Sequence, residues 1–307
     1  MTTTIESEVM QSATGEQIER RQNLSIEEFM REYAYANRPV IVTDALRRWN
    51  AVGRWTPEFF KKEFGDMKLS IDKVAWSKEH SGAALTMASF VDLVLSSTNE
   101  NPAPYLRNQN LIELFPTLIQ DVSPMPAYCY PNWLPESYLL KSLQRVFREH
   151  SEIQFYFGGT GGAFPILHYD VLASHAYLFQ IYGRKKFIVF GPDQTPYLYL
   201  QPRNFSQVNV EKPDLEKFPL FKQAKATTFI LEPGEFLFVP SKWWHTTKML
   251  TPSITLSLNV VNDSNWAALT EWVCSGRKPI LRLPSRVYLN AAGSRRTQRD
   301  KRLRQAK

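Results

Sequence analysis

A histidine and an aspartate stand two residues apart in the second half of the chain, at His168 and Asp170. They belong to a run, residues 166–171, whose β-branched and aromatic composition predicts a strand. Because side chains alternate across a strand, His168 and Asp170 would share one face, and Tyr169 would point to the other. One metal ion could bind both residues, although a buried histidine paired with a neighbouring carboxylate explains such a spacing equally simply.

A third ligand has to come from another part of the chain, and His245 is the candidate. It follows Trp243-Trp244 at the end of a predicted strand over residues 235–240. Two histidines and one carboxylate form the facial triad that leaves coordination positions open, which suits iron(II) and dioxygen chemistry. Zinc hydrolases use similar ligands but usually keep a single open position. Spacing alone leaves both the metal site and the ordinary buried histidine as interpretations.

Short runs of β-branched and aromatic residues follow one another from about residue 153, separated by glycine-containing turns such as Gly183-Arg184 and Pro233-Gly234. Besides 166–171, the runs that predict strands are 153–157, 176–182, 185–190, 227–231, 235–240 and 254–261. Many short strands joined by tight turns are typical of a sandwich or barrel. We therefore predict a mainly β fold with flanking helices.

The first part of the chain is predicted to be mostly helical. Ser25 and Glu28 form a capping-box pattern that begins a helix toward residue 35, and Thr56-Pro57 begins another that ends at Gly65. A third helix is expected over 87–95. Two short strands are expected in the same region, over 40–42 and 105–107.

These patterns divide the chain into five predicted parts. Residues 1–22 are expected to be frayed, and 23–120 to form a helical cap with the first strands. The β core is expected over 121–262, and it begins with an irregular segment, 121–137, that is rich in proline and aromatic residues. A helix over 266–273 lies in a C-terminal packing or dimerisation element, 263–293, and a basic tail follows over 294–307.

The formal net charge of +7 is unevenly distributed. Residues 294–307 hold seven lysines and arginines against one acidic residue, Asp300, so the remainder is nearly neutral. A neutral body with a basic tail is a weak electrostatic footprint for nucleic-acid binding. We expect a solvated or helical end that aids solubility or packs on a partner, with phosphate binding as the alternative.

The cysteines and the N-terminal segment indicate the compartment. Cys129 and Cys274 give neither a disulfide framework nor a metal-binding spacing. The polar, acidic start MTTTIESEVMQSATGEQ lacks the basic residues and apolar core of a signal peptide. No apolar run approaches the ~18 residues that span a bilayer. We therefore expect a cytoplasmic protein that does not associate with membranes.

Several segments, taken in order, resemble one family. They are RPVIVTDALRRWNAVGRWTPEFFKKEFGD at 38–66, HYD at 168–170, QIYGRKKFIVFGPDQTPYLYL at 180–200, PDLEKFPLF at 213–221 and EPGEFLFVPSKWWH at 232–245. They make the chain similar to the Jumonji-C (JmjC) oxygenases, in the cupin-like branch that includes the asparaginyl hydroxylase factor inhibiting hypoxia-inducible factor. The resemblance implies a double-stranded β-helix, also called a jelly roll, with Fe(II) and the cosubstrate 2-oxoglutarate.

The resemblance also assigns residues to 2-oxoglutarate. Lys185 matches the family lysine that pairs with the distal carboxylate, where a charge-assisted bond would be strong. For its neighbour Lys186 we expect a solvated side chain. Tyr105 matches the tyrosine that donates its hydroxyl to the same carboxylate, with a core tyrosine as the alternative.

The last predicted strand carries a polar face and an apolar face. Polar side chains inside a barrel are costly unless they have partners, so an inward Asn259 suits the family's asparagine position near the metal, and Ser257 on the same face is a further candidate for binding the cosubstrate. The alternative is a face in contact with water. The apolar face would hold Ile254, Leu256, Leu258 and Val260, and the polar face Thr255, Ser257 and Asn259.

Two positions depart from the family pattern. Relatives often carry a hydroxyl residue just before His-x-Asp, where this chain has Phe164 or Pro165, and an asparagine on the following strand, where it has Leu178. These departures put the affinity and binding mode of 2-oxoglutarate in question. His175 is expected to be structural rather than a fourth ligand.

The resemblance implies a dioxygenase that uses O2 to hydroxylate a side chain of a protein or peptide, with decarboxylation of 2-oxoglutarate to succinate. The same chemistry on a tRNA base or a small metabolite is the first alternative. Lysine demethylation is less favoured because no histone-reading module accompanies the domain. A non-catalytic cupin-like scaffold that binds a metal is the remaining class. A homodimer through the helix over 266–273 is compatible with each of them.

Overall fold

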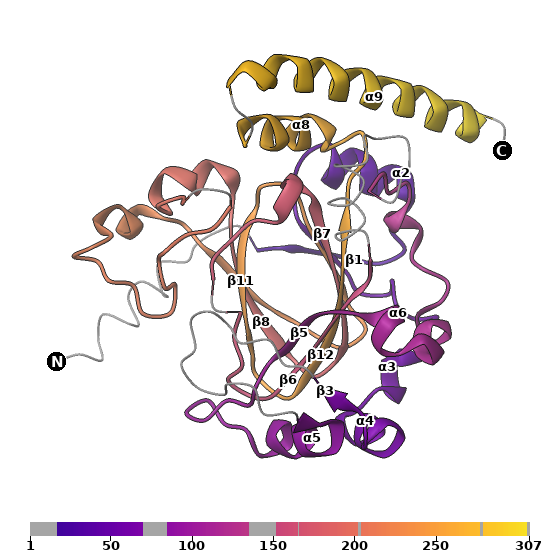
Figure 1. The fold of residues 1–307 in the computed structure, drawn as a ribbon, viewed down its shortest axis with the longest axis vertical. Coiled ribbons are helices and arrows are strands. Elements are labelled where there is room, and N and C mark those ends of the chain that lie inside the picture. Colours follow the sequence, from indigo (N-terminus) through magenta and orange to yellow (C-terminus); the bar gives the residue numbers. More distant parts are fainter. Residues whose placement is uncertain are drawn as a thin grey trace.

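A seven-stranded sheet forms the centre of the molecule (Figure 1). The computed structural model describes residues 17–69, 85–134, 152–164, 166–201, 204–276 and 279–305. The first two strands of the sheet run parallel and all other neighbours run antiparallel. In spatial order the strands are β1 (Glu19–Arg21), β2 (Val40–Val42), β10 (Phe236–Val239), β7 (His175–Tyr182), β12 (Ser253–Val260), β6 (Gln154–Gly158) and β5 (Leu106–Asn110).

A second, three-stranded antiparallel sheet consists of β11 (Trp244–Met249), β8 (Lys185–Phe190) and β9 (Thr227–Leu231). One cavity is lined by residues from both sheets, so the two sheets enclose it between them. A short ribbon of β3 (Lys68–Leu69) and β4 (Leu85–Thr86) lies apart from both sheets. The jelly roll expected from the sequence is confirmed.

Strand alternation gives the large sheet one face that packs in the largest apolar core and a second face that combines apolar residues with the polar residues of the cavity. On β12 the apolar residues predicted to share a face, Ile254, Leu256, Leu258 and Val260, all join the largest apolar core. Tyr177 and Phe179 of β7 join the same core. The helices of the N-terminal half pack against this face, and the opposite face lines the cavity.

The predicted N-terminal helices form with the expected caps. Ser25 and Glu28 make the complete capping box of α2 (Ile26–Phe29), which continues into a π-helical turn, η1 (Met30–Ala34). Thr56 caps α4 (Pro57–Phe64) by accepting from the Phe59 amide. The remaining helical elements of this half are α3 (Ala51–Arg54), α5 (Met87–Ser96), α6 (Leu111–Leu114), η2 (Pro116–Val122) and η3 (Ala127–Cys129).

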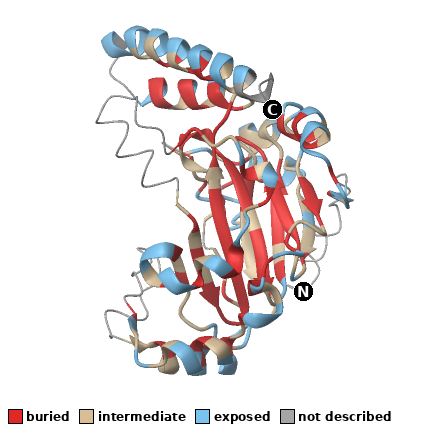
Figure 2. Cartoon of the chain, turned by 90° about the vertical axis from the view of Figure 1, so that its right-hand side faces the viewer, coloured by how far each residue is buried: buried red, intermediate tan, exposed pale blue. Residues whose placement is uncertain are grey.

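Three short 3-10 helices interrupt the core: η4 (Val171–Ala173), η5 (Pro192–Tyr197) and η6 (Pro219–Gln223). The predicted helix over 266–273 is α8 (Trp266–Ser275), followed by the long α9 (Pro279–Gln305). The predicted basic tail is therefore largely the second half of α9. Figure 2 shows α9 with its exposed residues on the outer side and its buried residues toward α8. In the part of the chain that the structure describes, no helix is long and apolar enough to cross a membrane.

Several strand predictions need correction. The segment predicted to be frayed over 1–22 contains β1, whose residues 19–21 pair with β2. Residues 166–171 do not form a regular strand, because only isolated bridges at His168 tie this segment to Phe205 and His245. His245 does not end the preceding strand but lies in a separate strand, β11. The predicted irregular segment 121–137 extends past residue 134, and its last three residues lie outside the described ranges.

Candidate metal centre

The backbone brings His168 and His245 together although 77 positions separate them in the sequence. The His168 amide donates to the His245 carbonyl at 3.2 Å, and the His245 amide donates to the His168 carbonyl at 2.7 Å. This isolated antiparallel bridge holds the centres of the two imidazole rings 4.4 Å apart. The two predicted histidine ligands are therefore neighbours because of main-chain pairing.

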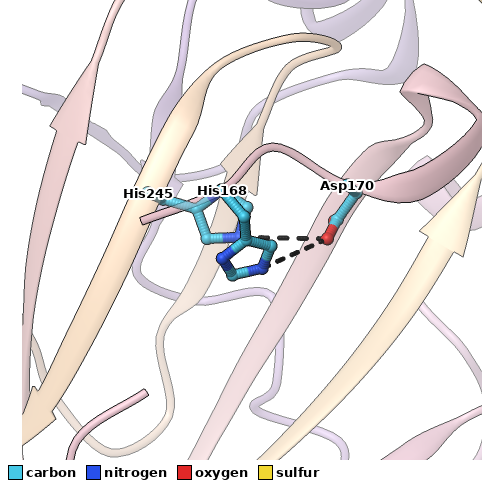
Figure 3. Close-up of side chains that lie close together, drawn as sticks. All are labelled: His168, Asp170 and His245. Carbon is cyan, nitrogen blue, oxygen red and sulfur yellow. Dashed lines mark ion pairs between the residues drawn. The ribbon is translucent and has the colours of Figure 1, made fainter. Parts of the chain in front are cut away.

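Hydrogen bonds orient both imidazole rings toward Asp170 (Figure 3). Nδ1 of His168 lies 2.9 Å from the Ile166 carbonyl, and Nδ1 of His245 lies 3.2 Å from the Trp243 carbonyl. A carbonyl oxygen only accepts, so each Nδ1 carries the proton and each Nε2 presents a lone pair. This is the arrangement of metal-binding histidines.

The carboxylate of Asp170 completes the group. Its Oδ1 lies 3.7 Å from Nε2 of His168 and 4.0 Å from Nε2 of His245. Both distances are too long for a hydrogen bond. They are shorter than twice a metal–ligand bond of about 2.1 Å, so one ion can contact all three atoms. Among the described residues, these three form the one His/Cys/Asp/Glu cluster with such spacing.

Asp170 reaches this position from an irregular segment. It precedes η4 with an extended backbone, φ −67° and ψ 148°, and its side chain does not cap that turn. The chain then turns sharply through Leu172 (φ 60°) and Ala173 (φ 47°), two buried residues in the left-handed region. The predicted shared face of His168 and Asp170 is therefore retained, although a bridge and a turn produce it instead of a regular strand.

Burial keeps His168 in the neutral form. Burial and, to a smaller extent, the neighbouring His245 lower the pKa of the imidazole to about 4, while Asp170 opposes the change. A neutral imidazole is the form that binds a metal.

The seven residues that the sequence assigned to the metal or to 2-oxoglutarate all line one cavity of about 380 Å³. This volume lies within the range of small-molecule sites, about 300–1,000 Å³. The predicted residues in its wall are Tyr105, His168, Asp170, Lys185, His245, Ser257 and Asn259. Leu178, at one of the two family departures, also lines it, as does Phe164, whereas Pro165 lies outside the described residues.

Lys185 places an ammonium group inside the cavity. Lys185 is 3% exposed, and its Nζ lies 3.4 Å from the Tyr105 hydroxyl. Nζ also lies 5.7 Å and 5.9 Å from the ring centroids of Tyr105 and Tyr156. Among the described residues no carboxylate lies within 4.0 Å of it. Burial lowers the pKa of this ammonium group to about 7.

The polar face of β12 is also built into the cavity. Ser257 faces Leu178 of β7 and Gln154 of β6 across the sheet, and all three line the cavity. Asn259 donates its amide to the Ser174 hydroxyl at 2.6 Å, which fixes its orientation. The predicted polar face therefore has partners on the protein side.

The structure adds residues that the sequence did not single out. Tyr156 lines the cavity and donates to Asn108 Oδ1 at 2.6 Å. The alternating run at 153–157 could have revealed Tyr156, because Gln154 and Tyr156 share its less buried face. Thr246 and Thr247 could not be found this way, because they belong to the unpredicted strand β11.

His175 and the two tryptophans that precede His245 lie outside the cavity lining. His175 accepts from the Ser241 amide and bonds the Ser264 hydroxyl, so it is structural, as predicted. Of the aromatic residues around His245, Trp243 donates to the Asn37 carbonyl and Trp244 to the Thr195 hydroxyl. Neither lines the cavity, whereas Phe187 of β8 does.

Comparison with known proteins identifies this architecture. A family model described as "Cupin-like domain" matches residues 26–268. The chain belongs to this cupin-like family. Over 239 residues the cupin-like chain is 30% identical to lysine-specific demethylase 8 of Xenopus tropicalis, an overlap of 76% of the chain and 50% of that protein.

Two further relatives show the breadth of the family. JmjC domain-containing protein D of Dictyostelium discoideum is 28% identical over 246 residues, covering 76% of the cupin-like chain and 53% of the relative. The tRNA wybutosine-synthesizing protein 5 of Mus musculus is 26% identical over 249 residues, covering 74% and 72% respectively. The chain thus spans about half the length of the demethylase and of protein D. These matches confirm the resemblance to JmjC oxygenases, whose cofactors are Fe(II) and 2-oxoglutarate.

The residues of the cupin-like chain fit both cofactors. Three ligand atoms surround a space that no direct hydrogen bond closes, and their types suit iron(II). The buried ammonium of Lys185 lacks a carboxylate partner among the described residues, and the distal carboxylate of 2-oxoglutarate would supply one.

Proposed function

We propose that this chain is an Fe(II)- and 2-oxoglutarate-dependent oxygenase that hydroxylates an amino-acid side chain of a protein or peptide. The observation that carries the proposal is the presence, in one cavity, of a two-histidine, one-carboxylate group and a buried ammonium group. A metal scaffold would need the first group but not the second. A cosubstrate with two carboxylates needs both.

His168, Asp170 and His245 would hold the iron. Their ring orientation is fixed before metal binding by the Ile166 and Trp243 carbonyls, so little reorganisation accompanies binding. When bound, Fe(II) with 2-oxoglutarate supplies the activation of O2 that oxidises a C–H bond, with 2-oxoglutarate converted to succinate and CO2. The protein contributes position and a defined cavity.

Lys185 and Tyr105 would hold the distal carboxylate of 2-oxoglutarate. Both groups point toward the same space, and the tyrosine hydroxyl can donate a second hydrogen bond. Leu178 offers no hydrogen bond where relatives carry asparagine. Ser257 and Asn259 are the neighbouring polar groups on β12 that we assign to contacts with the cosubstrate.

Among substrates, a protein side chain accords with relatives that are named lysine-specific demethylases. Oxidation of a tRNA base is the second candidate. It is favoured by the wybutosine-synthesizing relative, of which the chain covers 72%, and by the basic second half of α9.

The test begins with the purified chain, Fe(II), 2-oxoglutarate and O2. We expect formation of succinate and Mn(II) binding detectable by electron paramagnetic resonance. Asp170→Ala should abolish both, because it removes one of three ligands. Asp193→Ala, which changes a carboxylate on η5 outside the cavity lining, is the matched control and should alter neither. Absence of 2-oxoglutarate binding together with absence of succinate would refute the proposal.

The substrate class requires a second measurement. Cellular proteins from strains that express the wild type or Asp170→Ala are compared for an oxygen-atom mass increase. A modified protein present only with the wild type supports peptide hydroxylation. A modified tRNA base with unchanged proteins would favour the second candidate.

A further inference from the structure

An arginine on β5 lies beside the cavity without an assigned role. Leu106 points into the apolar core, so the next residue, Arg107, points to the opposite side of the sheet, toward the cavity. The pairing of β5 with β6 shifts register between Leu106 and Gln109, and Asn108 adopts φ 53°. Bulges of this kind occur next to active sites, where they redirect side chains.

Arg107 is positioned by a stack of rings that reaches the metal ligands. Its guanidinium lies 5.3 Å from the ring centroid of Phe164, which lines the cavity. Phe164 in turn stacks on His168, with ring centroids 4.6 Å apart and planes at 29°. A cation held over a phenyl ring gains modest attraction while its donors remain available. The stack therefore places an arginine one ring away from the metal site.

The guanidinium has no acidic partner in the ranges that the structure describes. Among the described residues, no carboxylate lies within 4.0 Å of it, and no side-chain acceptor is within hydrogen-bond distance of its donors. By contrast, Lys248 on β11 is paired with Glu211 at 3.2 Å. Of the described residues that line the cavity, Asp170 alone is acidic, and we assign it to the metal. Arg107 is thus a partly buried cation with donors available to a ligand.

We infer that Arg107 recognises a carboxylate of the substrate, the side chain of an aspartate or glutamate near the residue that is oxidised. This inference rests on the proposed function and adds the substrate's charge to it. Planar guanidinium groups pair with carboxylates through two parallel hydrogen bonds, which fixes orientation as well as affinity. A substrate held in this way would present its neighbouring side chain at the metal.

Charge at the cavity also argues against other substrates. A methylated lysine would bring a positive charge next to Arg107, which has no acidic partner among the described residues, and this costs binding energy. A nucleic acid is bound through several phosphates at once and needs a row of basic residues. Of the described residues that line the cavity, Lys185 is the one lysine or arginine, and it is assigned to 2-oxoglutarate. One arginine suits one carboxylate.

The test measures peptide binding and so does not depend on turnover. Protein loaded with Mn(II) and 2-oxoglutarate is titrated with fluorescent peptide libraries that are identical except for Glu, Gln or Lys at fixed positions. We expect the wild type to bind the Glu library about tenfold more tightly than the Gln library, the effect of one charge-assisted pair. Arg107→Gln should remove this preference, and Arg107→Glu should reverse it toward the Lys library.

Arg38→Gln is the matched control. Arg38 also lies over an aromatic ring, that of Tyr33 at 5.8 Å, but Tyr33 does not line the cavity, whereas the Phe164 ring beside Arg107 does. This variant should keep the Glu preference. Mn(II) binding and thermal unfolding of each variant show that it is folded.

Two results would overturn the inference: equal affinity of the wild type for the Glu and Gln libraries, or a Glu preference that survives in Arg107→Gln. Arg107-dependent binding of tRNA without a Glu preference would likewise replace carboxylate recognition by phosphate recognition. None of these results bears on succinate formation, which tests the proposed function separately.

Discussion

The environment of Lys185 makes it the residue on which 2-oxoglutarate binding should depend most. Its ammonium group lies 5.7 Å and 5.9 Å from the ring centroids of Tyr105 and Tyr156, and burial destabilises the charge. We expect Lys185→Ala to raise the Kd for 2-oxoglutarate by about 10- to 100-fold, because it removes a charge-assisted hydrogen bond. Isothermal titration of the Mn(II)-loaded protein measures this change.

Lys186→Ala provides the comparison. Lys186 follows on the same strand but lies outside the cavity lining, and we expect no change in Kd. Equal effects of the two substitutions would show that another cation binds the distal carboxylate.

The lowered pKa of Lys185, about 7, also predicts a dependence of 2-oxoglutarate affinity on pH. The ligand carboxylate binds the protonated amine, so binding takes up a proton wherever the free site is neutral. Below pH 7 the amine is already charged and affinity is constant. Above pH 7 the Kd should rise by about tenfold per pH unit, until the pKa of the bound form is reached.

A Lys185→Arg variant separates this effect from other titrations. A guanidinium stays protonated throughout this range, so its Kd should be constant between pH 6.5 and pH 8.5 even if binding is weaker. Because the pKa of His168 is lowered to about 4, its ring stays neutral at these pH values. A pH-independent Kd in the wild type would contradict the assignment.

The pairing of β7 with β12 forms the centre of the large sheet and the back of the cavity. The Thr255 hydroxyl donates to Oε1 of the buried Gln180 at 2.8 Å. The Gln180 amide in turn donates to the Tyr182 and Gly183 carbonyls, each at 2.8 Å. These bonds satisfy polar groups at the turn that leads to Lys185.

Thr255→Val should therefore reduce the free energy of unfolding by about 1–3 kcal/mol, because it leaves the Gln180 oxygen buried without a donor. Thr255→Ser keeps the hydroxyl and should cost less than half as much. Urea denaturation of the two variants measures the difference. A valine variant as stable as the wild type would mean that the Gln180 oxygen finds another donor.

Sequence patterns predicted those elements whose apolar periodicity is strong. The strands β7, β8 and β12 and the caps at Ser25 and Thr56 follow directly from local chemistry. β1 was missed because its residues, ERR, are charged and its pairing with β2 is tertiary. β11 was missed because His245 was placed at the end of the preceding predicted strand and because its last four residues, TTKM, alternate weakly.

The residues of the candidate site were likewise predicted where local sequence determines them and missed where the tertiary fold does. His168, Asp170, His245 and Lys185 were found because their types and neighbours resemble a known motif, and all four line the cavity. The contact between His168 and His245 could not be predicted, because it depends on an isolated bridge between segments far apart in sequence. Arg107 was also missed, because its position depends on a bulge and on the ring of Phe164.

At the scale of the whole molecule, α8 and α9 close one end of the fold by side-chain contacts that reach back to the core. Trp133 donates its indole N–H to the Asp300 carboxylate at 2.7 Å, and Trp266 donates to the Leu289 carbonyl at 2.8 Å. Gly293 permits close approach, since a Cβ there would lie 2.3 Å from the Trp266 indole. The basic segment therefore packs against the rest of the fold on one side and exposes charged residues on the other.

The two sides of the basic segment predict the effect of removing it. Removal of residues 294–307 deletes Asp300 and uncovers Trp133, so we expect a loss of about 2 kcal/mol in the free energy of unfolding, from one buried hydrogen bond and lost apolar burial. Neutralising the outer face with Arg295→Gln and Arg302→Gln, both exposed residues, should change it by less than about 0.5 kcal/mol.

Thermal and urea unfolding distinguish these outcomes, and they decide how nucleic-acid binding has to be tested. If the truncated chain is destabilised and the double glutamine variant is not, a loss of tRNA binding in the truncated chain would report unfolding as much as lost phosphate contacts. The double variant would then be the informative one, because each lost phosphate contact lowers the salt dependence of tRNA binding by about one unit of slope. A truncation without effect on stability would instead show that Trp133 does not need Asp300, and that the segment is free to serve a partner.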